Sequence, residues 1–228
     1  MRFPALACDY DGTLAADGRV GRVTLAALRR LKESGGRLVL VTGRQVGDLL
    51  TAFPGAATFD RIVGENGAIL CRPATGRVAL LTAAVDPAFV AALAARGVEP
   101  LSVGRAVVAT LEVHHDVVLA TIHDLGLDLA VTLNRGALMV LPSGIDKATG
   151  LRAALGELGL RPRDAVAIGD GENDQSFLDG CGCAAAVGNA VPALKARADY
   201  VTRAADGAGV AELVALLVDE DLATACPR

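Results

Sequence analysis

Aromatic and basic side chains are scarce and scattered in this chain. Aromatic residues make up 3% of its 228 residues, tryptophan is missing, and the formal net charge is −4. Surfaces that bind nucleic acids combine clustered Lys and Arg with aromatic side chains that stack on bases. Because the sequence shows no such cluster, we expect a small-molecule partner and no nucleic-acid partner.

Long apolar runs are missing as well. Hydrophobic residues make up 52% of the sequence, but charged residues, at 21%, interrupt every run. None approaches the roughly 18 to 20 apolar residues that a membrane helix needs. Residues 1–9 contain an apolar stretch too short for the core of a signal peptide. We therefore expect a cytoplasmic protein without a membrane partner.

Cysteine is present without the spacing of a zinc site. The five cysteines form an odd set with no C-x-x-C pair: Cys8, Cys71, Cys181, Cys183 and Cys226. This pattern argues against both a zinc site and a disulfide framework. We expect unpaired, buried thiols in a reducing compartment.

Short apolar runs alternate with segments of 3.6-residue periodicity, a pattern typical of βα units. Residues 5–8 and 38–41 predict buried parallel strands. The helix between them is expected to start at Thr24 as N-cap and to stop at residues 35–36, both glycine. The C-terminal third repeats this order, with a helix over residues 151–158 and later strands. Those strands are expected at residues 165–168, 184–187 and 199–201.

The middle of the chain, residues 83–143, has a different pattern. It predicts the order αββαββ, with segments at 87–95, 100–103, 106–113, 116–125, 129–132 and 137–141. Such an order describes a small antiparallel sheet with helices on one side. The expected fold class is therefore α/β, with a Rossmann-like parallel-sheet core formed by residues 1–82 and 144–228. An α+β domain, residues 83–143, is inserted into that core.

Two carboxylates directly follow the first predicted strand, in the segment DYDGTL of residues 9–14. Ligands of open α/β sheets bind at the carboxyl ends of the strands. Alternation along an extended chain points Asp9 and Asp11 to the same side, and Gly12 lets the backbone turn away. A solvated Asp-Gly turn is the other interpretation. An EF-hand loop is disfavoured, because Thr13 and Leu14 occupy positions where that loop needs other residues.

Three more segments carry groups that phosphate chemistry uses. Thr42 ends the second strand with a hydroxyl and exposed amides, within VTGR. Lys147 opens a helix, so its ammonium and the positive end of the helix dipole can meet one anion. The segment GDGEND, residues 169–174, follows a strand and offers oxygen ligands suited to magnesium.

These segments, in this order, resemble the four motifs of the haloacid dehalogenase superfamily, at residues 9–14, Thr42, Lys147 and 169–174. The wording TGR at 42–44 and ENG at 65–67 is similar to the Cof-like branch with a large insert after the second motif. That branch includes sugar phosphatases, phosphoglycolate phosphatases and sucrose-phosphate phosphatases. The resemblance implies that the insert is a C2-type α/β cap over the active site. Phe177 departs from the Met or Leu that is common in the family.

The resemblance also implies roles for single residues. Asp9 would be the nucleophile and Asp11 the general acid and then general base, while Thr42 and Lys147 would bind the phosphoryl oxygens. Mg²⁺ would be held by the Asp9 carboxylate, the Asp11 carbonyl and Asp170, with Asn173 and Asp174 as support. Weaker candidates for substrate contact are Gly43, Arg44, Glu65, Asn66, Asn134 and Arg135.

The resulting prediction is a magnesium-dependent phosphatase that hydrolyses a small phosphate ester through an aspartyl-phosphate. The chemistry agrees, because a carboxylate that attacks a phosphate dianion needs cations and N–H donors around the equatorial oxygens. A phosphomutase of the same superfamily and a receiver-like phospho-acceptor domain are the alternatives. The G-x-G-x-x-A match at residues 180–185 precedes a strand and so lacks the context of a dinucleotide site. Neither the metabolite nor the oligomeric state is evident from the sequence.

Overall fold

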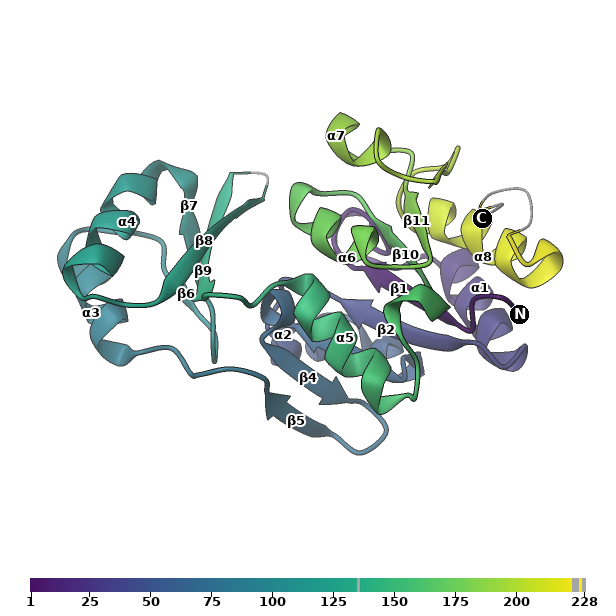
Figure 1. Cartoon of the computed structure of the whole chain (residues 1–228), viewed down its shortest axis with the longest axis horizontal. Coiled ribbons are helices and arrows are strands. Elements are labelled where there is room, and N and C mark those ends of the chain that lie inside the picture. The colour runs from purple at the N-terminus through teal and green to yellow at the C-terminus, as the bar shows by residue number, and fades with distance from the viewer. Residues whose placement is uncertain (135, 223–225, 227–228) are drawn as a thin grey trace.

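The computed structural model describes residues 1–134, 136–222 and 226. Figure 1 shows two parts, a larger α/β part that contains both termini and a smaller part built from the middle of the chain. In the described residues, the larger part has an eight-stranded sheet and the smaller part a four-stranded sheet. The expected fold class, a parallel-sheet core with a small α+β cap, is confirmed.

The core sheet has the strand order β12-β11-β10-β1-β2-β3-β4-β5. From β12 to β3 neighbouring strands are parallel, and β4 and β5 add an antiparallel edge that the sequence patterns did not predict. All five residues of β1 are buried, as expected for a strand covered on both faces. The strands are β1 Ala5–Asp9, β2 Arg37–Val41, β3 Arg61–Gly64, β4 Ile69–Arg72, β5 Arg77–Leu80, β10 Ala165–Gly169, β11 Cys183–Ala186 and β12 Tyr200–Val201.

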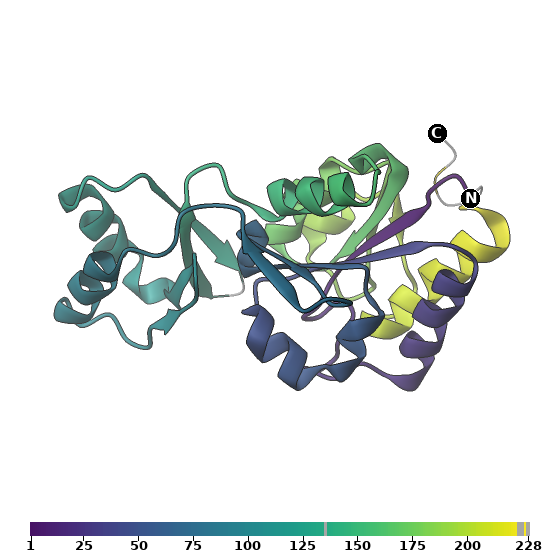
Figure 2. The same cartoon turned by 90° about the horizontal axis from the view of Figure 1, so that it is seen from below.

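Helices cover both faces of this sheet. Figure 2 shows α1 and α8 side by side on one face, where they contact each other, and α5 and α6 on the opposite face. The core helices are α1 Arg22–Glu33, α2 Val46–Ala52, α5 Lys147–Glu157, α6 Gln175–Asp179, α7 Pro192–Lys195 and α8 Asp206–Glu220.

The expected N-cap of α1 was wrong. The helix begins at Arg22 with Gly21 as its N-cap, and Thr24 is buried inside the first turn. A Cβ placed on Gly207 of α8 would lie 2.5 Å from Thr24 Oγ1. Thr24 therefore packs against the start of α8, and a threonine in a packed contact has the same local sequence signal as a cap. The expected stop is confirmed, because α1 ends at Glu33 before the two glycines.

The cap consists of a sheet in the order β6-β7-β9-β8 and of two helices, α3 and α4. In Figures 1 and 2 the helices lie on the side of this sheet that faces away from the core. The elements are α3 Pro87–Ala95, β6 Ser102–Val103, β7 Val108–Leu111, α4 His115–Asp124, β8 Leu129–Asn134 and β9 Ala137–Pro142. The order αββαββ matches the expectation. The proposed domain boundaries, 83–143 against 1–82 and 144–228, remain a prediction.

The strand expected over residues 106–113 is shorter than the sequence indicates. Only Val108–Leu111 pair in the sheet, and a 3-10 turn occupies Glu112–His114. The N–H groups of Ala106 and Val107 donate to the Glu65 carboxylate of the core. The apolar sequence of these two residues is thus compatible with a strand, but a side chain from the other part replaces the strand partner.

The expectation that all cysteines are unpaired was wrong. Cys183 of β11 and Cys226 form a disulfide, with their Cα atoms 6.1 Å apart and a separation of 43 positions in sequence. Cys8, Cys71 and Cys181 are free. The pairing depends on the path of the chain after α8, which no local spacing of cysteines indicates.

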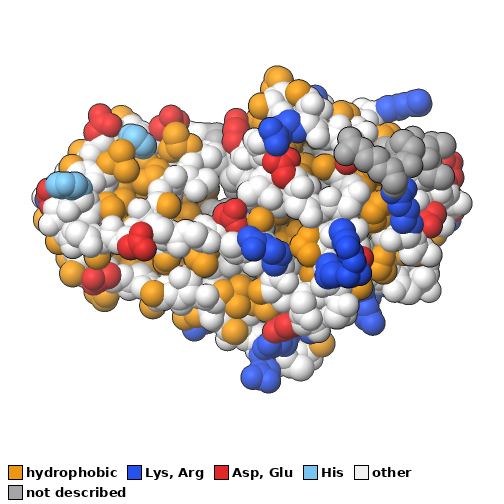
Figure 3. Space-filling model, viewed as in Figure 1, with side chains coloured by type: hydrophobic (Ala, Val, Ile, Leu, Met, Phe, Trp, Pro, Cys, Tyr) orange, Lys and Arg blue, Asp and Glu red, His pale blue; other side chains and the backbone are white. Residues whose placement is uncertain are grey.

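The distribution of surface charge and the length of the helices concern the expected absence of nucleic-acid and membrane partners. On the face shown in Figure 3, Lys and Arg side chains lie mainly over the core and are interspersed with acidic and apolar side chains. Among the described residues, no helix is both long and apolar enough to cross a membrane. The absence of a nucleic-acid partner remains a prediction.

Candidate active site

Four charged residues meet at the carboxyl edge of the core sheet. β1 and β10 are parallel neighbours, so Asp9 at the end of one strand and Asp170 just after the other share an edge. Asp174 ends the 3-10 turn Glu172–Asp174 in the same loop. Lys147 is the first residue of α5, which packs on β2, β3 and β4. The fold thus brings together segments more than 130 residues apart in sequence.

The Lys147 ammonium bridges two of the carboxylates. Its Nζ donates to Asp9 Oδ1 at 2.6 Å and to Asp174 Oδ1 at 2.5 Å. Lys147, Asp9, Asp170 and Asp174 are 3%, 5%, 2% and 1% exposed, respectively. At this burial water screens the charges little, so the cluster has a strong local field.

Burial and the neighbouring charges shift the pKa values of the cluster's members. Burial raises the pKa of Asp9 well above its ordinary value, and the charge of Asp174 raises it further, whereas Lys147 lowers it. For Lys147, burial lowers the pKa, but the charges of Asp174 and Asp9 outweigh burial and raise the pKa above its ordinary value. Lys147 is therefore charged, and the carboxylates around it outnumber the positive charge.

The carboxylates are arranged so that they could hold a metal ion. Oxygens of Asp9, Asp170 and Asp174 lie within 4.8 Å of one another. Three buried carboxylates and one ammonium leave an excess of negative charge, and carboxylate oxygens are the hard ligands that Mg²⁺ prefers. The donor set therefore fits a divalent cation.

Gly12 and Thr13 shape the acidic pocket from the side of Asp170. Gly12 has a φ of +76°, and a Cβ on it would lie 2.5 Å from Asp170 Oδ2. The glycine thus lets the backbone turn, as expected, and also lets Asp170 approach. Thr13 Oγ1 donates to Asp170 Oδ1 at 2.7 Å. The sequence did not indicate this contact, because a hydroxyl in an Asp-Gly-Thr turn has many alternative partners.

Asp174 also organises its own loop. Its Oδ2 accepts hydrogen bonds from the N–H groups of Asp170 at 2.8 Å and Gly171 at 2.9 Å. Asn173, the other expected support of the metal, donates from Nδ2 to Asn66 Oδ1 at 3.2 Å. One carboxylate oxygen of Asp174 thus holds the loop, while the other contacts Lys147.

Asp11 lies on Arg44 and is more exposed than Asp9. Arg44 Nε donates to Asp11 Oδ2 at 2.8 Å and Nη2 donates to Asp11 Oδ1 at 2.6 Å. The Asp11 side chain is 50% exposed and the Arg44 side chain is 34% exposed. The hydrogen bonds from Asp11 raise the pKa of Arg44 above its ordinary value, although burial lowers it. The Arg44 guanidinium also lies over the Tyr10 ring, 5.0 Å from its centroid.

Thr42 and Gly43 adjoin the segment ENG of residues 65–67. Thr42 is buried just after β2, and its Oγ1 accepts from the Arg44 N–H at 3.1 Å. The Thr42 carbonyl accepts from the Asn66 N–H at 3.0 Å. A Cβ on Gly43 would lie 3.3 Å from Asn66 Oδ1. The expected phosphate-binding loop and Asn66 therefore form one packed unit.

Asn134 reaches the acidic loop from the cap. It ends β8, and its Oδ1 is buried with no hydrogen-bond partner among the described residues. A Cβ on Gly171 would lie 2.8 Å from this oxygen. The structure therefore places Asn134 next to the acidic loop, and its contact with the substrate remains a prediction. Arg135 lies outside the described residues.

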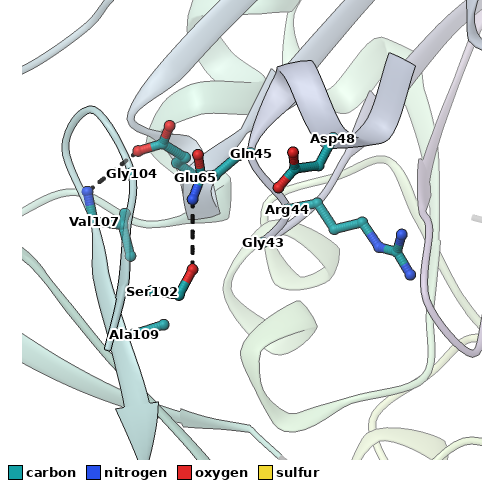
Figure 4. A pocket seen from close by; sticks show the side chains of 9 residues that line it. All are labelled: Gly43, Arg44, Gln45, Asp48, Glu65, Ser102, Gly104, Val107 and Ala109. Atoms are coloured by element: carbon teal, nitrogen blue, oxygen red, sulfur yellow. Dashed lines mark hydrogen bonds between the residues drawn. The ribbon is translucent and has the colours of Figure 1, made fainter. Parts of the chain in front are cut away.

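Cavities next to several of the expected site residues are lined by both the core and the cap. One of about 280 Å³ is lined by Gly43, Arg44, Gln45, Asp48 and Glu65 of the core and by Ser102, Gly104, Val107 and Ala109 of the cap (Figure 4). Another of about 380 Å³ is lined by Asn66, Thr132, Leu141, Ile145, Asp146, Lys147, Glu172, Asn173, Gln175, Ser176 and Asp179. Both are large enough for a small metabolite.

Sequence comparison decides the family. The sequence profile of the haloacid dehalogenase-like hydrolases matches residues 6–94 and 112–214, which hold Asp9, Lys147 and the acidic loop. The chain belongs to this family. The hydrolase is therefore an enzyme, and a non-enzymatic receiver-like domain is ruled out.

Relatives of known name and structure agree with this assignment. The hydrolase is 32% identical to the phosphoglycolate phosphatase of Methanothermobacter thermautotrophicus, over 92% of this chain and 96% of that protein. It superposes with a TM-score of 0.80 on a structure described as a HAD/COF-like hydrolase from Plasmodium vivax, at 19% identity and 96% coverage of both chains. A HAD subclass IIB sugar phosphatase superposes at 0.72, with 21% identity over 87% of this chain and 92% of the other. The last two likenesses concern the fold alone.

Proposed function

We propose that this hydrolase is a magnesium-dependent phosphatase that cleaves small phosphate monoesters through an aspartyl-phosphate on Asp9. The observation that carries the proposal is the buried cluster in which Lys147 bridges Asp9 and Asp174 beside Asp170. A phosphate dianion entering this pocket meets a carboxylate nucleophile, and Lys147 and amide donors neutralise its oxygens.

The names of the relatives and the sizes of the cavities support a substrate class. Curated relatives at 32% and 30% identity over most of their length are named phosphoglycolate phosphatase. Cavities of about 280 and 380 Å³ accommodate a leaving group of a few carbon atoms. We therefore propose phosphoglycolate or a small sugar phosphate as the substrate.

The residues of the chain have distinct tasks in this reaction. Asp9 attacks phosphorus, and Lys147 holds its carboxylate in place and neutralises a phosphoryl oxygen. Thr42 Oγ1 already accepts from the Arg44 N–H, so its own hydrogen is free to be donated to a second phosphoryl oxygen. Asp170, held by Thr13, and Asp174 would bind Mg²⁺ together with Asp9. When bound, the cation supplies positive charge that lets two anions approach each other.

Asp11 is proposed as the acid for the leaving oxygen and then as the base for water. Both oxygens of its carboxylate accept hydrogen bonds from the Arg44 guanidinium. To donate a proton in the first step, Asp11 must leave Arg44 and approach the substrate. Arg44 is thus proposed to contact the substrate once Asp11 has moved.

Removal of divalent cations should abolish turnover. Without the cation, Asp9, Asp170, Asp174 and the phosphate concentrate negative charge that one ammonium does not balance. Purified protein is assayed for inorganic phosphate release from a panel of phosphate esters in excess chelator, and again after Mg²⁺ is added back. Release that restarts with Mg²⁺ supports the assignment. Full turnover in chelator would remove the metal from the proposal.

Asp9→Asn should abolish turnover and leave the fold intact, because the amide keeps the shape and removes the nucleophile. The expected loss exceeds about 100-fold, or about 2.7 kcal/mol in the barrier. Circular dichroism of the variant controls for folding. Residual activity above that level would contradict covalent catalysis by Asp9.

A separate measurement distinguishes the phosphatase from a phosphomutase. A phosphatase releases free phosphate, whereas a phosphomutase transfers the phosphoryl group to a second sugar hydroxyl.

A further inference from the structure

A core carboxylate holds a loop of the cap at the site. Glu65 is 2% exposed, and its Oε1 accepts from the Arg105 N–H at 3.1 Å. Its Oε2 accepts from the N–H groups of Ala106 at 2.8 Å and Val107 at 3.2 Å. All three donors belong to the segment that precedes β7 of the cap. Figure 4 shows the Glu65 side chain pointing toward this segment across the cavity wall.

The contact is close and requires an unusual backbone. A Cβ on Gly104 would lie 2.5 Å from Glu65 Oε2, so a glycine is needed where the loop meets the carboxylate. Glu65 and Asn66 have φ values of 49° and 51°, in the left-handed region that non-glycine residues rarely adopt. Such conformations persist where surrounding contacts hold them, and they gather at functional sites.

Residues 65–67, the segment that contains Glu65, also contact the segments of the core that carry the proposed catalytic residues. The Glu65 N–H donates to the Arg44 carbonyl at 3.0 Å. The Asn66 side chain contacts Met139 of the cap sheet and Asn173 of the acidic loop. A Cβ on Gly67 would lie 1.8 Å from the carbonyl oxygen of Asp146, which precedes Lys147. The segment that binds the cap loop therefore adjoins residues next to both Arg44 and Lys147.

We propose that Glu65 is a positioning residue that fixes the cap over the catalytic carboxylates by binding the N–H groups of residues 105–107. Charge-assisted hydrogen bonds are strong where water is excluded. With the loop held, Ser102 and Ala109 line the cavity opposite Arg44, and Asn134 lies at the acidic loop. Glu65 thereby determines which leaving groups are bound. This inference rests on the proposed function for its kinetic part only.

The kinetic test compares two esters in two variants of Glu65. In Glu65→Ala, kcat/KM for the alkyl phosphate that the wild type prefers should fall about tenfold or more, mainly through KM. For p-nitrophenyl phosphate, whose phenolate leaves without help from the cap, kcat/KM should change by less than about threefold. Glu65→Gln keeps the shape and one acceptor oxygen, and should restore part of the loss. Equal losses on both esters would overturn the proposal.

Glu212→Ala is the matched control. Glu212 of α8 is also a carboxylate that accepts from backbone N–H groups, those of Arg203 and Ala204. It belongs to the core and has no part in the proposed site. The variant should lower stability without changing the ratio of the two esters. If Glu212→Ala shifts this ratio as much as Glu65→Ala does, loss of stability explains both, and the positioning role is wrong.

A test without turnover separates failure of this inference from failure of the proposed function. Hydrogen exchange of the Arg105, Ala106 and Val107 amides should accelerate about tenfold or more in Glu65→Ala, because these amides lose their acceptor. Gly104→Ala, introduced alone, should cause the same acceleration, since the added methyl group displaces the Glu65 carboxylate. In the Glu65→Ala background, Gly104→Ala should have little further effect. Independent, additive effects of the two substitutions would contradict the contact, whether or not the enzyme hydrolyses any ester.

Discussion

At the scale of single residues, Asp11 and Arg44 form a hydrogen-bonded pair in which Asp11 is also the proposed general acid. The guanidinium holds Asp11 by two hydrogen bonds and lies over Tyr10, so Asp11 has a defined position before substrate enters. Both carboxylate oxygens of Asp11 accept from Arg44 while this pair is intact. The proposed acid step therefore includes an exchange in which the substrate phosphate attracts Arg44 and releases Asp11.

Asp11→Asn tests this role, because a general acid matters only when the leaving group is poor. Loss of the proton donor should slow phosphorylation of the enzyme by an alkyl phosphate about 10²- to 10⁴-fold. With p-nitrophenyl phosphate the loss should be distinctly smaller, since nitrophenolate is a stable anion. Burst kinetics resolve this first step from the second, in which Asp11 is the proposed base.

The amide in this variant keeps the size of the side chain and leaves the Asp11 carbonyl in place. Tyr10→Phe is a suitable control, because it removes the hydroxyl that donates to the Gly18 carbonyl at 3.1 Å and keeps the ring below Arg44. This control should preserve the burst with both esters. Equal slowing of the burst with both esters in Asp11→Asn would leave Asp11 with a positioning role alone.

The sequence indicated the charged cluster but missed the contacts that Thr13 and Glu65 make around it. Asp9, Lys147 and Asp174 stand at strand or helix ends in a fixed order, and parallel strands bring such ends to one edge of the sheet. The contact of Thr13 with Asp170 depends on how the turn closes over the opposite loop. The contact of Glu65 with the cap depends on how two parts of the fold meet. Neither arrangement has a local sequence pattern.

Among the elements, α5 has the clearest link between local structure and the site. Its N-cap is Asp146, whose Oδ1 accepts from the Thr149 N–H at 2.8 Å. Thr149 Oγ1 in turn accepts from the Asp146 N–H at 3.0 Å, which completes a capping box. The next residue after the cap is Lys147. The start of the helix thus determines where the ammonium lies.

Asp146→Ala should destabilise the protein and impair catalysis together. Loss of the cap costs about 1 kcal/mol, which corresponds to about 2 to 4 °C in Tm for a chain of this size. Because Lys147 then loses its fixed position, kcat for p-nitrophenyl phosphate should fall as well. Thermal unfolding and steady-state assays measure the two effects.

Asp86→Ala is the matched control for this prediction. Asp86 caps α3 of the cap, and its Oδ1 accepts from the Ala88 N–H at 2.8 Å. Its removal should cost a similar free energy without a loss of kcat for p-nitrophenyl phosphate. An unchanged kcat in Asp146→Ala would show that α5 positions Lys147 by packing alone.

Element types followed from the sequence more reliably than element ends. The periodicity of the sequence was sufficient to predict α3, α5 and the central strands, because burial of one face or both faces imposes a regular pattern of apolar residues. The start of α1 and the length of β7 were wrong for one physical reason. In each case a polar or backbone group that looked free for local structure has a partner from another element, α8 for Thr24 and Glu65 for the amides before β7.

Across the whole molecule, the cap and the core meet at amide, backbone and apolar groups in addition to the Glu65 carboxylate. Gln45 of the core donates to the Val103 carbonyl of the cap at 3.3 Å, and Ala68 of the core packs in one apolar cluster with Met139 and Leu141. The order αββαββ predicted an inserted unit but not the surface that it presents. That surface depends on which strand face is turned to the core, and alternation leaves both choices open.

Asn134 is the cap residue whose position bears most directly on substrate choice. It ends β8 beside Gly171 of the acidic loop, and its buried Oδ1 has no donor among the described residues. A buried acceptor without a partner is costly, so a hydroxyl or another donor of the bound leaving group is the expected partner. The cap would then select substrates by a hydrogen bond made next to the reacting phosphate.

Asn134→Ala should therefore change the preference among substrates more than it changes hydrolysis of a generic ester. Loss of one neutral hydrogen bond corresponds to about 1 kcal/mol, or about fivefold in kcat/KM for an ester with a hydroxyl donor. For p-nitrophenyl phosphate, which has no such donor, kcat/KM should remain near the wild-type value. Leu133→Ala is the control, because alternation along β8 points this neighbour to the opposite face of the cap sheet. It disturbs the same strand without removing the amide. Equal losses with every ester in Asn134→Ala, or the same change of preference in Leu133→Ala, would show that β8 supports the cap without reading the leaving group.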